Sequence, residues 1–186
     1  MVPARLAEAT LVIIDAQEEY WSGRLPLFGM AAAVERVGAL LAVARAAGTP
    51  VILVVHRGRT GGLFDPAAPN GAILADLQPL PGETVIEKGL PSAFAGTDLQ
   101  EQLRLISRPG LLVAEFMTHM CVSTTARAAL HVGYRVTVAA DATATRALPD
   151  PLGGPAIGAA EVQRTALADL ADRFAAVVPT SALMAI

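Results

Sequence analysis

Short aliphatic runs alternate along the chain with longer segments whose apolar residues recur at helical spacing, and this alternation limits the fold more than any other feature. An uninterrupted aliphatic run is typical of a strand buried on both faces, as in a parallel sheet covered by helices on both sides. The pattern predicts an α/β fold, with three αβα layers around a six-stranded parallel sheet. The expected strands span residues 10–14, 51–55, 84–87, 111–114, 135–139 and 175–178, and the expected helices span residues 30–47, 98–106, 121–132 and 159–174.

Length and composition favour one globular domain. A chain of 186 residues has the size of a single α/β domain, so we expect one domain over residues 1–186. Hydrophobic residues make up 53% and charged residues 17%, which excludes a disordered chain. The 14 Lys and Arg against 17 Asp and Glu leave a net charge of −3, so we expect no nucleic-acid partner and no anionic membrane partner.

The cellular setting is also indicated by the sequence. The single cysteine excludes a disulfide framework within the chain and a cysteine-based zinc site. No apolar run approaches the ~20 residues of a membrane span, and residues 1–8 lack the core of a signal peptide. We expect a cytoplasmic protein. Its aliphatic composition is compatible with a homodimer or homotetramer.

Two loop signals stand out. Residues 57–82 are rich in Gly and Pro, with one helical turn expected near residues 73–77, and at this length the segment is more typical of a functional loop than of a passive connection. Thr97, with Gln100 three residues later, predicts a capping box before the second long helix.

Potentially reactive side chains follow several of the expected strands. Asp15, His56 and Lys88 each come directly after an aliphatic run, and the segment leading to Cys121 follows another. The carboxyl ends of parallel strands share one edge of the sheet, where ligands bind. We therefore expect these four side chains at one edge.

Cys121 has two interpretations. A free cysteine is most often a small buried hydrophobic residue. At the expected start of a helix, however, unpaired N–H groups and the helix dipole would stabilise a thiolate. The bend at residues 116–120 before it would present the sulfur beside backbone N–H groups suited to an oxyanion.

The other candidates have alternatives too. Asp15 either caps a turn or accepts the thiol proton and returns it to a leaving group. Lys88 is either solvated or favours the charged forms of Asp15 and Cys121. His56 and His119 are rival bases for a Cys–His pair or hydrogen-bonded structural residues.

Weaker candidates lie near the same edge. Gln17, Tyr20 and Trp21 follow Asp15 and either line a pocket or serve packing. Arg57 and Arg59, in the Gly-rich loop, either bind a carboxylate or are solvated.

Three ordered segments resemble the isochorismatase-like cysteine hydrolase family: residues 11–17 (LVIIDAQ), 87–94 (EKGLPSAF) and 117–122 (MTHMCV). Residues 124–130, 133–134 and 141–146 extend the match over essentially the whole chain. The resemblance implies a Rossmann-like sheet, a homo-oligomer, and a catalytic triad on Asp15, Lys88 and Cys121.

The resemblance also implies a cis peptide bond between Phe116 and Met117, with the N–H groups of Met117 and Cys121 forming an oxyanion hole. Six further residues are expected to bind substrate: Gln17, Tyr20, Trp21, His56, Phe94 and Phe116. Two departures matter. Glu115 stands where the family usually has Gly, and residues 56–60 (HRGRT) lack the Asp-x-His-x-x-His metal pattern of nicotinamidases. We therefore expect no metal and no cofactor, and nicotinamide becomes a less favoured substrate.

The resulting hypothesis is a cysteine hydrolase that cleaves a C–N bond of a small amide, ureido or carbamoyl compound through an acyl-thioester. One alternative is hydrolysis of an isochorismate-like vinyl ether with Asp15 as the acid. Another is an inactive homologue that binds a small molecule.

Overall fold

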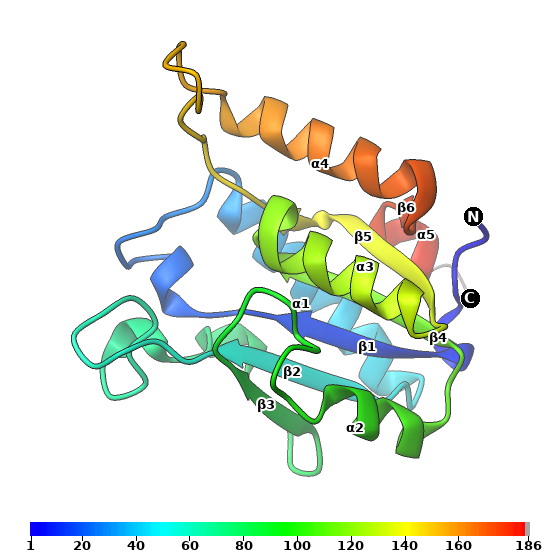
Figure 1. The fold of residues 1–186 in the computed structure, drawn as a ribbon. Coiled ribbons are helices and arrows are strands. Elements are labelled where there is room, and N and C mark those ends of the chain that lie inside the picture. The colour runs from blue at the N-terminus through cyan, green and yellow to red at the C-terminus, as the bar shows by residue number, and fades with distance from the viewer. Residues whose placement is uncertain (185–186) are drawn as a thin grey trace.

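A computed structural model of the protein describes residues 1–184, without the side chain of Glu115. Six parallel strands form one sheet in the order β3-β2-β1-β4-β5-β6 (Figure 1). The α/β fold with a six-stranded parallel sheet is therefore as predicted. The strands are β1 (Ala9–Ile14), β2 (Val51–His56), β3 (Thr84–Lys88), β4 (Gly110–Phe116), β5 (Arg135–Ala144) and β6 (Ala176–Val178).

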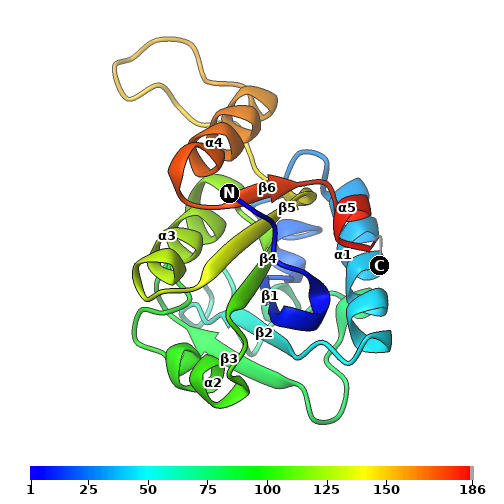
Figure 2. The same cartoon turned by 90° about the vertical axis from the view of Figure 1, so that its right-hand side faces the viewer.

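Helices cover both faces of the sheet. Figure 2 shows α1 and α5 on one side and α2, α3 and α4 on the other. The helices are α1 (Met30–Ala46), α2 (Leu99–Ile106), α3 (Ser123–His131), α4 (Ala159–Arg173) and α5 (Thr180–Met184). None of the helices among residues 1–184 has the length and apolar character needed to cross a membrane.

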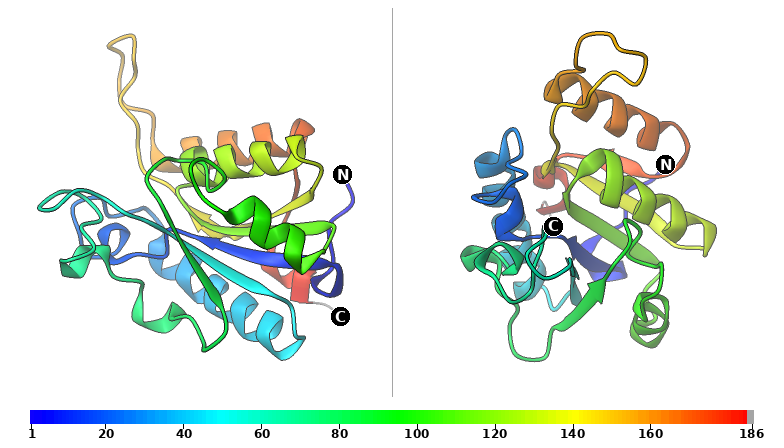
Figure 3. Two further views of the ribbon diagram at one scale, coloured as in Figure 1. Left: turned by 60° about the horizontal axis from the view of Figure 1, so that its bottom comes forward. Right: turned by 60° about the vertical axis from the view of Figure 1, so that its left-hand side comes forward.

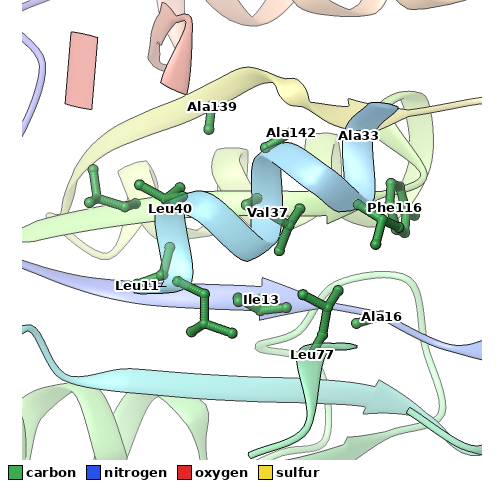
Figure 4. Packing of buried hydrophobic residues seen from close by; sticks show 14 of the residues in the cluster. Leu11, Ile13, Ala16, Ala33, Val37, Leu40, Leu77, Phe116, Ala139 and Ala142 are labelled. Atoms are coloured by element: carbon green, nitrogen blue, oxygen red, sulfur yellow. The ribbon is translucent and has the colours of Figure 1, made fainter. Parts of the chain in front are cut away.

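Each face of the sheet has its own hydrophobic core, and β1 contributes to both. Leu11 and Ile13 lie in the core beneath α1, with Val37 and Leu40 of that helix (Figure 4). Val12 and Ile14 point to the opposite core, which includes residues of α2, α3 and α4. Successive side chains of a strand alternate between faces, so a strand with two cores must be apolar at every position. This explains the aliphatic run that predicted it.

The chain crosses over at the centre of the sheet. It passes from β1 outward to β2 and β3, and then returns to place β4 on the other side of β1. The carboxyl ends of β1 and β4 thus flank a topological switch point, where open α/β sheets bind their ligands. Asp15 follows β1, and Phe116 ends β4.

Two loops extend from this carboxyl edge of the sheet, one after β2 and one between β5 and α4 (Figure 3). The first, predicted as a functional loop, contains 3₁₀ turns at Pro69–Gly71 and Ala75–Leu77. Its backbone is fixed to the segment after β1, because Glu18 donates to Ala72 O at 2.9 Å and Leu74 donates to Ala16 O at 2.8 Å. The loop is therefore held in place beside the switch point.

Three local predictions were wrong. β5 runs to Ala144 rather than 139, because its pairing with β4 resumes after a register shift between Val113 and Glu115. The helix expected from residue 121 starts at Ser123, after a π-helical turn over Thr118–Val122. The capping box is absent, because Asp98 rather than Thr97 occupies the N-cap of α2. Thr97 Oγ1 instead donates to Ala93 O and accepts from the Leu99 N–H.

Candidate active site

Four of the predicted side chains meet at the carboxyl edge, three of them in the interior. Lys88 Nζ donates to Asp15 Oδ2 at 2.8 Å and lies 3.4 Å from Cys121 Sγ. The ring nitrogen Nδ1 of His56 is 3.3 Å from the same ammonium. Asp15, Lys88 and Cys121 are only 0%, 1% and 3% exposed. The structure therefore brings together four side chains that the sequence placed at one edge.

The positions of Asp15 and Lys88 follow from the strands that carry them. Asp15 comes directly after β1 with φ of +59°, a left-handed conformation that Asp tolerates better than most residues. Its N–H donates to Val54 O of β2 at 2.7 Å, which fixes the turn. Lys88 ends β3 opposite His56, the last residue of β2, so the parallel register sets these two side chains next to each other.

Cys121 sits within the π-helical turn that joins β4 to α3. The peptide bond between Phe116 and Met117 is cis, and the Met117 carbonyl accepts from the N–H groups of Met120 and Val122 at 3.0 and 3.3 Å. The sulfur is thereby directed toward Lys88 from a turn inside the fold. This differs from the expected position at the first residue of an α-helix.

Burial and neighbouring charges act on the protonation of Cys121. Burial first, and then the charge of Asp15, raise the pKa of Cys121 to about 12, against the lowering effect of Lys88. Burial also raises the pKa of Asp15 above its ordinary value, against the opposing charge of Lys88. These directions disfavour the expected resting thiolate. They favour a neutral thiol beside the ion pair of Asp15 and Lys88, because a third charge would be buried without a partner.

Neither histidine donates to or accepts from Cys121 Sγ in the described hydrogen bonds. His56 faces Lys88, and burial followed by the Lys88 charge lowers its pKa to about 4. His119 Nδ1 is bonded to Thr145 Oγ1, and burial lowers its pKa as well. The hypothesis of a Cys–His pair is not favoured by this arrangement.

The predicted pocket residues have different surroundings. Tyr20 and Phe116 are buried and pack edge to face, with ring centroids 6.1 Å apart. Trp21 lies on the surface with 47% of it exposed, and Phe94 is half-buried against the core that contains Cys121. A role for these four in substrate binding stays a prediction.

Gln17 is buried and hydrogen-bonded within the fold, so its predicted place in substrate binding stays a prediction. Its Nε2 donates to His56 O at 3.0 Å and to Gly71 O at 2.8 Å, and its Oε1 accepts from the His56 N–H at 2.7 Å. Each polar atom of the side chain therefore already has a protein partner. Gln17 joins the ends of β1 and β2 to the long loop.

The arginines of that loop do not take part in this cluster. Arg57 pairs with Glu87 at the surface. No described hydrogen bond or ion pair involves the Arg59 side chain, so its contact with a substrate stays a prediction. The side chain of Glu115, the departure from the family pattern, lies outside the described part of the structure.

Sequence reasoning missed the role of Glu19. Its buried carboxylate accepts from the N–H groups of Arg24 and Phe64 at 2.5 and 3.2 Å, and from the side-chain amide of Asn70. These bonds attach the long loop to the segment after Asp15. The sequence gives no signal for them, since Asn70 is 51 residues from Glu19.

Among residues 1–184, no three His, Cys, Asp or Glu side chains are grouped as a set of metal ligands. The polar groups near Cys121 are the ammonium of Lys88, the carboxylate of Asp15 and the imidazole of His56. These groups form a hydrogen-bonded cluster in which Lys88 has its charge balanced by Asp15.

Comparisons with known proteins agree with this fold. Residues 9–182 match the family model of the isochorismatase domain. A secreted isochorismatase effector of Verticillium dahliae is 38% identical over 94% of this chain and 90% of its own length. The crystal structure of an isochorismatase from Pseudomonas putida KT2440 superposes with a TM-score of 0.95 at 48% identity, over 98% of this chain and 93% of that one.

Other relatives have names that state a reaction. A cysteine hydrolase structure from Pseudomonas syringae pv. phaseolicola has a TM-score of 0.88 at 28% identity, over 99% of this chain and 94% of that one. Nicotinamidase 3 of Arabidopsis thaliana is 31% identical over 74% of this chain and 73% of its own length. Maleamate amidohydrolase of Pseudomonas putida is 30% identical over 73% of this chain and 72% of its own length.

Proposed function

The chain belongs to the isochorismatase family of hydrolases, and from this membership we propose that it cleaves a C–N bond of a small amide, ureido or carbamoyl compound through a thioester on Cys121. The observation that carries the proposal is the position of Lys88, whose ammonium lies against both the Asp15 carboxylate and the Cys121 sulfur. Amidohydrolases among the relatives support the same reaction class.

Asp15 is the base in the first step. One of its oxygens, Oδ2, is bonded to Lys88, while Oδ1 is buried without a partner among the described residues. Oδ1 takes the proton of the Cys121 thiol as the sulfur bonds to the substrate carbonyl carbon. The carbonyl π electrons move onto its oxygen, where the N–H groups of Met117 and Cys121 stabilise the negative charge.

The same carboxyl group then acts as the acid. Asp15 returns its proton to the amine nitrogen as the C–N bond breaks, which leaves an acyl-thioester and a neutral amine. In the second half, Asp15 takes a proton from water, and the hydroxide oxygen bonds to the thioester carbon. The C–S bond breaks, and Asp15 gives the proton it took from water to the Cys121 sulfur. Lys88 keeps one positive charge beside whichever group carries the negative charge.

The alternative reaction, hydrolysis of an isochorismate-like vinyl ether with Asp15 as acid, does not need a thiol. The contact between Lys88 and Cys121 Sγ has no function in that reaction, so it supports the covalent route. The inactive-homologue hypothesis predicts no turnover of any amide. An ammonia-release assay on maleamate, nicotinamide, ureidoacrylate and N-carbamoylsarcosine, with Cys121→Ala as control, separates the covalent route from the other two hypotheses. Amide turnover that survives Cys121→Ala excludes the covalent route.

A substrate-free prediction follows from the raised pKa of Cys121. We expect iodoacetamide to alkylate wild-type Cys121 slowly at pH 8, with a rate that keeps rising toward pH 10, because the thiol has a pKa of about 12. Asp15→Asn removes a negative charge next to the thiol and leaves Lys88 in place, so the pKa of the Cys121 thiol falls. We expect at least ~10-fold faster alkylation at pH 8, although turnover is lost, since each pKa unit changes the thiolate fraction about tenfold.

Intact-mass spectrometry measures that alkylation rate, and Asp76→Asn, at an exposed carboxylate, is the control. Slower alkylation of Asp15→Asn than of the wild type would show that Asp15 already activates the thiol in the resting protein. The proposed proton transfer on substrate attack would then be wrong.

The predictions on partners and location stand as proposals. We propose a small-molecule substrate, self-association, and no nucleic-acid or membrane partner. A cytoplasmic location is a proposal as well, and one relative is a secreted effector. Size-exclusion chromatography with light scattering tests the oligomeric state.

A further inference from the structure

We propose that His56 is a positioning residue for Lys88: its neutral imidazole, with the proton on Nε2, accepts a hydrogen bond from the ammonium through Nδ1. This inference deepens the proposed function and rests on it, because it gives Lys88 its place between Asp15 and Cys121. The sequence left three interpretations of His56 open: a substrate-binding residue, a base for a Cys–His pair, or a hydrogen-bonded structural residue.

The three N–H bonds of the ammonium account for the geometry. Lys88 Nζ has three neighbours: Asp15 Oδ2 at 2.8 Å, His56 Nδ1 at 3.3 Å and Cys121 Sγ at 3.4 Å. An ammonium has three donors and no lone pair, so each neighbour must present an acceptor. Nδ1 of His56 therefore carries no proton, and in a neutral ring the proton must be on Nε2.

Burial and charge keep the ring neutral. A second positive charge at 3.3 Å from the ammonium would be repelled, and half-burial of His56 adds a desolvation penalty. The lowered pKa of His56, about 4, agrees with this assignment. Besides His56, the charged or titratable groups near the cluster are Asp15, Lys88, Cys121 and the neutral Tyr20 hydroxyl, and the Asp15 carboxylate is the group that forms an ion pair with Lys88.

The main chain of His56 is held from both sides. The side-chain amide of Gln17 accepts from the His56 N–H and donates to the His56 carbonyl, at 2.7 and 3.0 Å. The imidazole packs against the Phe64 ring with centroids 5.0 Å apart. Gln17 is two residues from Asp15. One short segment therefore carries the Asp15 carboxylate, which accepts from Lys88, and also fixes the main chain of His56.

The hydrogen bond to His56 sets the orientation of the Lys88 ammonium during catalysis. Without the Nδ1 acceptor, the third N–H bond of Lys88 has no buried partner, and an unsatisfied donor in the interior is costly. The ammonium then turns away from the line between Asp15 and Cys121. A group that acts this way changes kcat more than KM, because it aligns the proton transfer and does not touch the substrate.

Long-range ¹H–¹⁵N NMR of the imidazole rings tests the inference on the wild-type protein. The chain has three histidines, His56, His119 and His131, which single substitutions assign. We expect the His56 ring to show the neutral Nε2–H form from pH 5 to pH 8. A proton on Nδ1, or protonation of the ring between pH 5.5 and pH 7, would overturn the inference whichever amide is turned over.

Two substitutions provide the activity readout on the amide that the panel above identifies as the fastest. His56→Leu removes the acceptor, and we expect kcat to fall at least ~10-fold with KM changed less than ~3-fold. His56→Asn places an amide oxygen near the position of Nδ1 and is expected to restore kcat to within ~3-fold of the wild type. His131→Asn, at an exposed position, is the matched control.

Equal loss in His56→Leu and His56→Asn, or full kcat in His56→Leu, would also overturn the inference. These outcomes differ from failure of the proposed function. In that case Cys121→Ala retains amide turnover, while the NMR assignment of His56 is unaffected.

Discussion

Cys121→Ala is expected to abolish amide turnover, with a loss of about four orders of magnitude or more in kcat, because no other group replaces the sulfur as the attacking atom. Cys121→Ser keeps an acceptor beside Lys88, but its hydroxyl is far less acidic than a thiol. We expect it to lose at least about a thousandfold, since Asp15 must then deprotonate a much weaker acid. Ammonia release under substrate saturation measures both losses.

The fold should survive these substitutions. Cys121 belongs to the core that also contains residues of α3. Alanine at this position leaves only a small cavity. Circular dichroism and a thermal unfolding scan provide the control. A folded Cys121→Ala protein that keeps most of the wild-type rate of amide turnover would reject Cys121 as the nucleophile.

Lys88→Met has the largest expected effect on stability. The substitution removes the ammonium from a fully buried pair and leaves the Asp15 carboxylate without its charge partner. Breaking a buried ion pair on one side typically costs about 3–5 kcal/mol. We expect a drop of this order in the free energy of unfolding at pH 8, measured by urea denaturation. The double substitution Asp15→Asn with Lys88→Met should recover most of the loss, because no charge is then buried.

The pH dependence of that loss has a defined sign. Burial raises the folded-state pKa of Asp15, and removal of Lys88 takes away the charge that opposes the rise. The penalty is full above the folded pKa of Asp15 in the variant, and it shrinks as the pH falls from that value toward the pKa of the unfolded chain, because protonation removes the unpaired charge. We therefore expect the difference between wild type and Lys88→Met to shrink toward pH 5.

Arg57→Met is the matched control, since it breaks a surface pair with Glu87 and should change stability little. Equal stability of the Lys88→Met and wild-type proteins at pH 8 would contradict the buried ion pair. A double variant as unstable as Lys88→Met would contradict it too.

The sheet and the edge at which the site lies could be predicted from the sequence. The aliphatic run of β1 is explained by its two cores, and Asp15 and Lys88 follow from the positions where β1 and β3 end. Both are local signals, because a polar residue after a buried strand lies at the sheet edge whatever the rest of the chain does. The family resemblance added the predicted role of Cys121 and the cis peptide bond between Phe116 and Met117.

The surroundings of these residues could not be predicted in the same way. The raised pKa of Cys121 depends on burial and on Asp15, which is 106 positions away in the chain. The roles of Gln17 and Glu19 depend on contacts with Gly71 and Asn70 across the long loop. Such contacts leave no periodicity or spacing, because they form only after the sheet has brought the segments together.

A thioester on Cys121 during turnover is the most direct evidence for the account. Acid quenching of the reaction with the fastest amide, followed by intact-mass and peptide analysis, is expected to find the acyl part of that substrate on the peptide that contains Cys121. Turnover with an unmodified Cys121 at every quench time, together with an active Cys121→Ala variant, would contradict it.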